Sequence, residues 1–340
     1  MKAKTLRQRW SRLLAEHRPS AGASMASGRT RALLIALALL LVLNLLLGWY
    51  WSREPDLQPL LEPQSGQPAG THTASTLQAL MQHLLDKPGG YLSNDILPPS
   101  VFLDNMPNWE FGVLVQVRDM TRSLRRDMAR SQSQSAEDRD LARAEPRFHF
   151  DHNSWAMPAS ESEYRDGLKS LDAYIKRLHA GDAQFHARAD NLAGWIDDVS
   201  TRLGSLSQRL SASVGRERLD ATSASELESE GMVVEEDRVE TSWLQIDNVF
   251  YEARGQAWAL SHLLRAIEVD FADVLAKKNA TISVRQIIRE LEAAQEPLWS
   301  PMVLNGSGYG VLANHSLVMA NYISRANAAI IDLRNLLSQG

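Results

Sequence analysis

The chain has 340 residues, a formal net charge of −5 at pH 7 and no cysteine, which excludes disulfide bonds, thiol nucleophiles and cysteine-based metal sites. The charge is unevenly distributed, because residues 52–340 hold 28 Lys and Arg residues against 40 Asp and Glu residues. A region near −12 lacks the basic footprint that binding to nucleic acid requires.

The N-terminal segment, residues 1–31, is basic. It contains eight Lys and Arg residues and a single acidic residue, Glu16. Basic segments beside a membrane span stay in the cytoplasm. We therefore expect this segment to be a cytoplasmic tail.

An apolar run without charged residues follows at residues 32–51. About twenty such residues cross a hydrocarbon core of roughly 30 Å. The run is longer than the apolar region of a cleaved signal peptide, and it ends in Trp49, Tyr50 and Trp51, which are typical of a membrane interface. The sequence predicts an uncleaved transmembrane helix in a bacterial inner membrane, with the rest of the chain in the periplasm.

Residues 52–74 are rich in proline and predict a linker, because such a segment cannot build a core. The folded domain is expected to cover residues 75–340. Its first helix, at about 75–86, carries an apolar stripe made of Leu77, Leu80, Met81, Leu84 and Leu85. A second helix, from about residue 108, carries a stripe made of Trp109, Val113, Val117, Met120 and Leu124.

Two long segments keep the 4-3 spacing of apolar residues that is typical of coiled coils. The first covers residues 164–210, with thirteen of fourteen seam positions apolar and Asp182 as the exception. The second covers residues 243–274, with all ten seam positions apolar. A polar, acidic stretch separates the two, so they predict an antiparallel coiled-coil hairpin at about 161–275. The spacing leaves open whether each helix pairs within the chain or with another copy.

Two further amphipathic helices are predicted, one after Ser283 and one over residues 312–337, and no segment after the linker has a convincing strand pattern. The predicted fold class is therefore all-α. A single N-terminal transmembrane helix precedes an elongated helical bundle dominated by the coiled-coil hairpin.

Three segments carry a family resemblance: GGYLSND (89–95), LDNMPNWEFG (103–112) and VQVRDMTRSLRRDMARSQSQS (115–135). The sequence resembles a family of proteobacterial membrane-anchored proteins that is known only as a domain of unknown function, DUF2333. The resemblance extends over most of the chain. It implies the anchored topology and brings no activity, cofactor or catalytic residue.

The irregular segments around residues 88–112 are the best candidates for a recognition surface, because aromatic residues beside polar groups favour binding. The alternative is a structural plug that covers one end of the bundle. The candidate residues are Tyr91, Asn94, Asp95, Asp104, Asn105, Trp109 and Glu110.

Metal and catalytic chemistry have little support. His149, Asp151 and His152 are weak candidates for metal ligands, since a fourth, distant ligand is not identifiable. The glycine-rich segment 304–310 lacks the Gly-Lys-Ser/Thr ending of a phosphate-binding loop. We expect no catalytic residue, no metal and no cofactor.

The leading functional hypothesis is a structural or interaction scaffold in the cell envelope, with envelope proteins or a second copy of the chain as partners. The first alternative is a ligand-sensing periplasmic domain, which would act through a partner because the expected cytoplasmic tail is short. A metal-dependent enzyme with its site at residues 149–152 is the second alternative.

Overall fold

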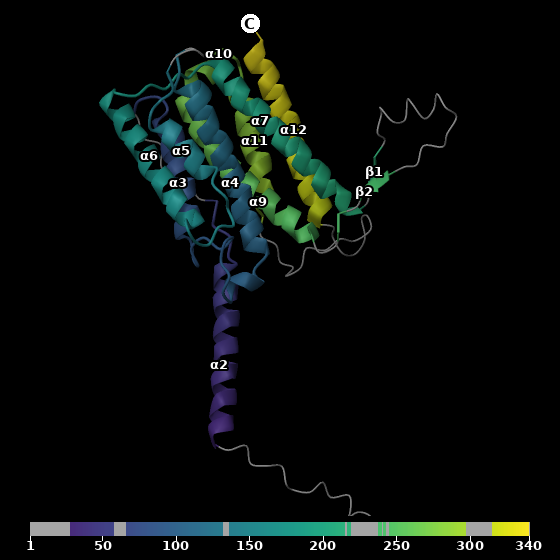
Figure 1. Ribbon diagram of the computed structural model, residues 1–340. Coiled ribbons are helices and arrows are strands. Elements are labelled where there is room, and N and C mark those ends of the chain that lie inside the picture. The colour runs from purple at the N-terminus through teal and green to yellow at the C-terminus, as the bar shows by residue number, and fades with distance from the viewer. Residues whose placement is uncertain are drawn as a thin grey trace, which may run out of the picture. The chain divides into compact units, whose positions relative to one another are not determined.

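The computed structural model describes residues 28–57, 66–131, 136–214, 216–218, 237–239, 241–242, 245–296 and 315–339. The chain divides into two compact units, Met1–Tyr50 and Trp51–Gly340, and helices make up most of the described residues, which confirms the all-α prediction (Figure 1). The second unit, here called the helical domain, contains α3 (Thr71–Asp86), η1 (Ser100–Phe102), α4 (Asn105–Ser123), η2 (Leu124–Met128), α5 (Leu141–Phe148), α6 (Ser160–Ala180), α7 (Ala189–Ser211), η3 (Ala212–Val214), β1 (Arg216–Arg218), β2 (Asp237–Val239), α9 (Ile246–Asp270), α10 (Ala272–Lys277), α11 (Thr281–Ala293) and α12 (His315–Ser338).

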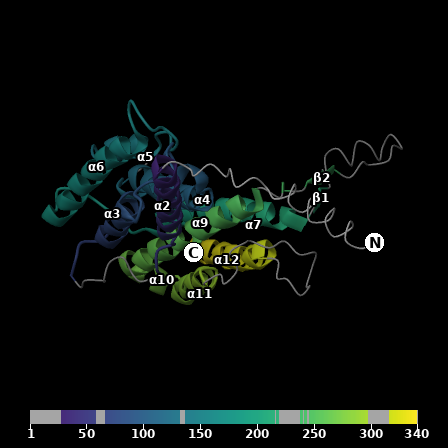
Figure 2. The ribbon, with the colours of Figure 1, turned by 90° about the horizontal axis from the view of Figure 1, so that it is seen from below.

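Helices α4 and α9 form the centre of the helical domain. Helices α3, α5 and α6 pack on one side of this pair, and α7, α11 and α12 pack on the other (Figures 1 and 2). The predicted apolar stripes of α3 and α4 are buried throughout, and so is the stripe of α12. These stripes are confirmed as the faces on which the core is built.

The backbones of α4 and α9 approach each other closely at two glycines. A Cβ on Gly255 would lie 2.0 Å from the carbonyl oxygen of Trp109, and one on Gly112 would lie 2.2 Å from that of Glu252. No side chain fits at such distances, so glycine is required at both positions. This close approach fixes the register of the central helix pair.

The helical domain has two distinct ends. At one end, here called the α10 end, the start of α3 meets the end of α9, where Thr73 N and Oγ1 each donate to Asp270 Oδ2 at 2.7 Å. At the other end, here called the loop end, the last residue of α3 meets the start of α6, where Arg165 Nη2 donates to Asp86 Oδ1 at 2.9 Å. The loops 87–104 and 149–159 lie at the loop end.

The unbroken 4-3 spacing over residues 164–210 predicts one continuous helix, and this prediction is wrong, because the structure has two helices there. Helix α6 ends at Gly181, whose φ of +78° is left-handed, and α7 begins only at Ala189. Asp182 is exposed in the connection and occupies no seam. The apolar spacing on either side is real, because each helix buries its own stripe.

The helices of the predicted coiled-coil hairpin do not pack mainly against each other in the structure. Helix α9 packs mainly against α4, and α7 packs mainly against α12. Apolar spacing identifies the face that a helix buries, but it contains no information about which helix covers that face.

Two boundaries also differ from prediction. Helix α3 begins at Thr71, four residues early, because the buried Thr71 and Thr73 extend a helix that the apolar stripe marks only from Leu77. The strands β1 and β2 form a short antiparallel pair that the sequence pattern did not predict. Three predictions fall outside the described residues: the first seam position at residue 243, the glycine-rich segment 304–310, and the start of the last helix at residues 312–314.

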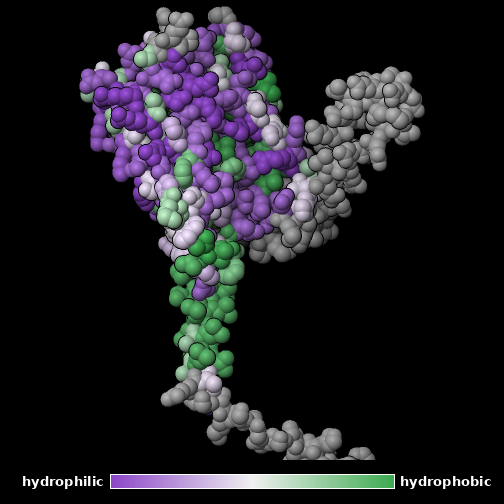
Figure 3. Space-filling model, viewed as in Figure 1, coloured by the Kyte–Doolittle hydropathy of each residue, from purple (hydrophilic) through white to green (hydrophobic). Residues whose placement is uncertain are grey.

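Helix α2 (Gly28–Trp51) belongs to the first unit except for its last residue, and its segment Thr30–Trp51 is long and apolar enough to cross a membrane. Its leucines other than Leu47 are exposed, and the helix is coloured as hydrophobic over nearly all its length in Figure 3. Its internal polar residue, Asn44, donates from Nδ2 to the carbonyl oxygen of Leu40 at 2.9 Å. This local bond satisfies part of the amide within the helix itself.

Candidate functional site

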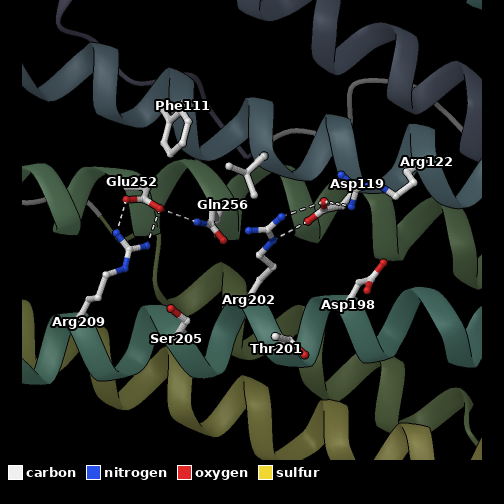
Figure 4. Close-up of a pocket in the computed structure, with 11 residues that line it drawn as sticks. Phe111, Asp119, Arg122, Asp198, Thr201, Arg202, Ser205, Arg209, Glu252 and Gln256 are labelled. Carbon is white, nitrogen blue, oxygen red and sulfur yellow. Dashed lines mark hydrogen bonds and ion pairs between the residues drawn. The ribbon is translucent and has the colours of Figure 1, made fainter. Parts of the chain in front are cut away.

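A polar pocket with a volume of about 470 Å³ lies between α4, α7 and α9 (Figure 4). Its lining combines three acidic and three arginine side chains with one aromatic ring. The lining residues are Phe111, Val115, Asp119, Arg122, Asp198, Thr201, Arg202, Ser205, Arg209, Glu252 and Gln256.

One charge cluster in the pocket centres on Asp119 of α4. Arg202 of α7 donates from Nε to Asp119 Oδ2 at 2.9 Å and from Nη2 to Oδ1 at 3.2 Å. Arg122 Nη1, one turn further along α4, donates to Asp119 Oδ1 at 3.0 Å. The buried carboxylate therefore ties α4 to α7 through charge-assisted hydrogen bonds.

A second cluster centres on Glu252 of α9. Arg209 of α7 holds both carboxylate oxygens at 2.6 Å in a bidentate arrangement, and Gln256 Nε2 donates to Glu252 Oε1 at 2.9 Å. The hydrogen bond to Glu252 raises the pKa of Arg209. Burial, reinforced by the charge of Asp119, raises the pKa of Asp198 on the same side of the pocket.

This arrangement joins three helices and leaves an open polar space between them. The three acidic and three arginine side chains balance in charge, so the pocket suits a small polar molecule that carries both signs of charge rather than a simple anion or cation. Sequence reasoning missed these residues. Arg202 and Arg209 are seven residues apart on α7, and this spacing was the available signal for a shared face.

A separate polar cluster closes the loop end around Glu110. Lys87 Nζ lies 2.6 Å from Glu110 Oε1, and both side chains are almost fully buried. The amide of Leu92 donates to Glu110 Oε1 at 2.9 Å, and the hydroxyl of Ser93 donates to Oε2 at 2.5 Å. Burial raises the pKa of Glu110, while Lys87 and these hydrogen bonds oppose the rise.

The structure places most of the expected recognition surface in the interior. Tyr91, Asn94, Trp109 and Glu110 are buried, so the prediction that they form a surface is wrong. The remaining three residues are at least partly accessible, with Asp95 and Asp104 exposed and Asn105 half-buried.

The buried members hold the loop end together. Tyr91 Oη donates to the carbonyl oxygen of His152 at 3.2 Å, and Asn94 Nδ2 donates to that of Ser154 at 2.8 Å. The ring of Trp109 packs 5.2 Å from that of Trp258, between centroids. In a sequence, an aromatic residue with a polar neighbour is equally typical of a binding site and of a closed loop, so the pattern does not show whether the residues are buried. These residues therefore build the structural plug that the sequence left as the alternative.

The loop proposed for metal binding is arranged for packing. Arg122 Nη2 lies 2.8 Å from His149 Nε2, and since a guanidinium only donates, this nitrogen must accept. His149 Nδ1 then donates to the carbonyl oxygen of Glu145 at 2.9 Å, which leaves the ring no lone pair for a metal. The ring of His152 packs 4.9 Å from that of Phe111, and Asp151 is largely exposed. Among the described residues, no group of three His, Asp or Glu side chains is placed to hold a metal ion.

The fold and the pocket define a class: an all-helical domain with an interhelical polar pocket, preceded by a helix that has the length and composition of a membrane anchor or a signal sequence. The chain belongs to the family described as uncharacterised proteins conserved in bacteria (DUF2333), which residues 24–340 match. This confirms the resemblance drawn from the sequence. No curated protein and no solved structure matches the chain.

Proposed function

We propose that this chain is a single-pass inner-membrane protein whose periplasmic helical domain serves as an interaction scaffold of the bacterial envelope. The anchor is supported by the exposed apolar surface of α2 and by its aromatic end. The orientation is supported by the eight basic residues that precede the span.

The absence of cysteine allows a clean test of this topology. We would place single cysteines at Ser11, before the span, and at Ile282, which is 77% exposed at the start of α11. With the outer membrane permeabilised and the inner membrane intact, an impermeant maleimide should label only the cysteine at position 282. Labelling of position 11 alone would show that the orientation is the opposite of the one proposed. Loss of the N-terminal segment from the purified protein would identify α2 as a signal sequence.

The observation that carries the scaffold role is the internal pairing of charges in the pocket. Arg122 and Arg202 bind Asp119, and Arg209 binds Glu252. These side chains are used to hold α4, α7 and α9 together, and such pairing suits a rigid support better than a reaction centre, which aims charge at a reacting atom.

Cross-linking of the full-length protein in cells, followed by purification and quantitative mass spectrometry, tests the scaffold role. A scaffold should retain one envelope assembly in near-stoichiometric amount. The double variant Arg202→Met/Arg209→Met provides a control, because it removes the pocket's cross-helix ion pairs and leaves the loop end intact. Recovery of no other envelope protein, and no second copy, would contradict the proposal.

The open volume of the pocket favours ligand sensing as a second candidate function. A bound ligand at 100 times its Kd raises the free energy of unfolding by about 2.7 kcal/mol. A thermal-shift screen of the full-length protein with zwitterionic metabolites would detect it. The candidate requires that Arg202→Met abolish the shift, and a screen without stabilising compounds would count against it.

A further inference from the structure

The loop end exposes large apolar side chains on both of its loops. They are Ile96, Leu97, Val101, Phe102, Trp155 and Met157, and each is more than half exposed. Phe102 is 77% exposed and Met157 is 98% exposed. Scattered exposed apolar residues are ordinary, but six on two adjacent loops at one end of a domain require an explanation.

Hydrogen bonds to the buried core hold these loops in place. Asn94 Nδ2 joins them by donating to the carbonyl oxygen of Ser154 at 2.8 Å. Ser160 Oγ, at the start of α6, shares its single proton between the carbonyl oxygens of Asp151 at 2.7 Å and Ser154 at 2.9 Å. The backbone of Met157 is left-handed, with φ of +57°, which places a bulky residue in a conformation it rarely adopts. The loops are therefore built to present apolar side chains outward.

The chain enters the helical domain at the same end. Trp51 is the last residue of α2 and the first of the helical domain, and it packs against the domain's core. A Cβ on Gly89 would lie 2.7 Å from Cγ of Trp51, so the indole lies directly on the loop that follows α3. Further along, Glu54 accepts from Arg254 Nε at 2.7 Å and the carbonyl oxygen of Asp56 accepts from Trp258 Nε1 at 3.1 Å. No free spacer separates Trp51 from the loop end.

From this placement we infer that the loop end is a membrane-contact surface, whose exposed apolar side chains enter the interfacial region of the bilayer in which α2 is anchored. The inference rests on the proposed anchor. The occupant is a lipid surface because the final residue of the span is itself part of the loop end. Apolar and aromatic side chains of this size are the ones that enter the boundary between headgroups and acyl chains.

The charges at the loop end indicate what kind of lipid contact this is. Asp95 and Asp104 are exposed beside the apolar residues, and Lys87, the nearest cation on the same loop, is buried against Glu110. Arg53 and Arg165 are exposed there as well, but the exposed acidic side chains Asp86, Asp95 and Asp104 outnumber them. Attraction to anionic lipid requires a surplus of exposed basic residues, so the contact is apolar.

The test uses the full-length protein, reconstituted into phosphatidylcholine vesicles. Single cysteines replace Leu97, Phe102, Leu40 or Ile282, and each carries an environment-sensitive fluorophore. Ile282 is the matched control, because it is 77% exposed, like Phe102, but lies beside α10 at the opposite end of the domain. The substituted loop positions are exposed, so the fold should tolerate the change.

Quenchers attached to the lipid acyl chains should reduce the fluorescence at Leu97 and Phe102 several-fold more than at Ile282. Addition of phosphatidylglycerol or of salt should leave this difference unchanged. Equal quenching at Phe102 and Ile282 would overturn the inference. Protection at Phe102 from an aqueous quencher, without lipid quenching, would also overturn it and would indicate a protein partner or second copy. The label at Leu40 separates the two proposals. If it is not quenched by the lipid quenchers, the proposed anchor is contradicted. If it is the only label quenched, the anchor stands and only the membrane-contact surface is contradicted.

Discussion

Helix α4 carries two buried carboxylates, Glu110 and Asp119, and the structure treats them differently. The cation that pairs with Glu110, Lys87, is only 1% exposed, whereas the arginine that reaches Asp119 across the pocket, Arg202, is 48% exposed. The first pair is sealed inside the loop end, and the second borders an open pocket. The same kind of ion pair therefore serves to close one region and to line another.

The difference shows how burial decides what an ion pair contributes. A sealed charge has lost its hydration, so its partner is indispensable. A charge at the edge of a pocket keeps contact with water and tolerates the loss of its partner better. Substitutions in the two regions should therefore differ in size, and the following predictions proceed from the largest effect to the smallest.

Glu110→Gln should have the largest effect. It leaves Lys87 buried without a counter-charge, and breaking a buried pair costs about 3–5 kcal/mol of unfolding free energy. Urea unfolding of the purified protein measures the loss. The double variant Lys87→Met/Glu110→Leu should recover part of it, because both charges are then absent. A loss under about 1 kcal/mol would indicate that Glu110, whose pKa burial raises, is already protonated in the folded protein.

Gly255→Ala should lower the unfolding free energy by about 3 kcal/mol, because overpacking forces the backbones of α4 and α9 apart. A Cβ at Gly255 would lie 2.0 Å from the carbonyl oxygen of Trp109. Gly194→Ala in α7 is the matched control, since a Cβ there meets nothing within 4 Å. That variant should gain about 0.5–1 kcal/mol from helix propensity. A neutral Gly255→Ala would contradict the close approach of the α4 and α9 backbones.

These two glycines also show what the sequence could and could not predict. Apolar spacing identified the buried faces of α3, α4, α9 and α12, because burial of a stripe is a local property of a helix. It did not identify the pairing of α4 with α9, which depends on the absence of side chains at Gly112 and Gly255 from helices far apart in the chain.

The polar sites were harder to predict for the same reason. The sequence places Glu110 among candidate surface residues, whereas in the structure it accepts from four donors. Arg202 and Arg209 lie outside the predicted apolar seam, and the sequence does not show which carboxylates they meet. A single sequence shows the charge of a residue, but the burial that decides its role depends on residues far away in the chain. The prediction of a continuous helix across Gly181 failed for a different reason, because the heptad spacing continues past the residue at which α6 ends.

The third prediction concerns the buried residue His262. Burial, with smaller contributions from Arg265 and His83, lowers its pKa from 6.5 to about 3. Between these two values the unfolded chain binds the proton that the folded protein refuses, so stability must fall as the pH falls. From pH 7 to pH 5 the loss from this residue is about 2 kcal/mol.

Urea unfolding at both pH values, on the natural protein and on His262→Phe, isolates this contribution from that of other groups. The natural protein should lose about 2 kcal/mol more than the variant over the same interval. Phenylalanine keeps the ring beside Trp258, 4.6 Å away between centroids in the natural protein. Equal losses in the two proteins would mean that water or a neighbour stabilises the protonated ring.

The smallest effects are expected for two arginines that each join two helices but differ in how exposed their ion pairs are. Arg209→Met removes the bidentate bond that links α7 to Glu252 on α9 and should cost about 1 kcal/mol, because the guanidinium is partly solvated. Arg165→Met removes the bond to Asp86 at the loop end, where both side chains are more than half exposed, and should change the unfolding free energy by less than about 0.5 kcal/mol.

Denaturant unfolding of these two variants beside Glu110→Gln then compares three ion pairs that differ in burial. A cost at Arg209 that equals the cost of Glu110→Gln would mean that the pocket is closed to water and that its charges are structural. A cost at Arg209 no larger than at Arg165 would mean that the pocket's ion pairs open without penalty. The arginines would then be free to exchange Glu252 and Asp119 for a bound ligand, which is what the sensing function requires and the scaffold does not.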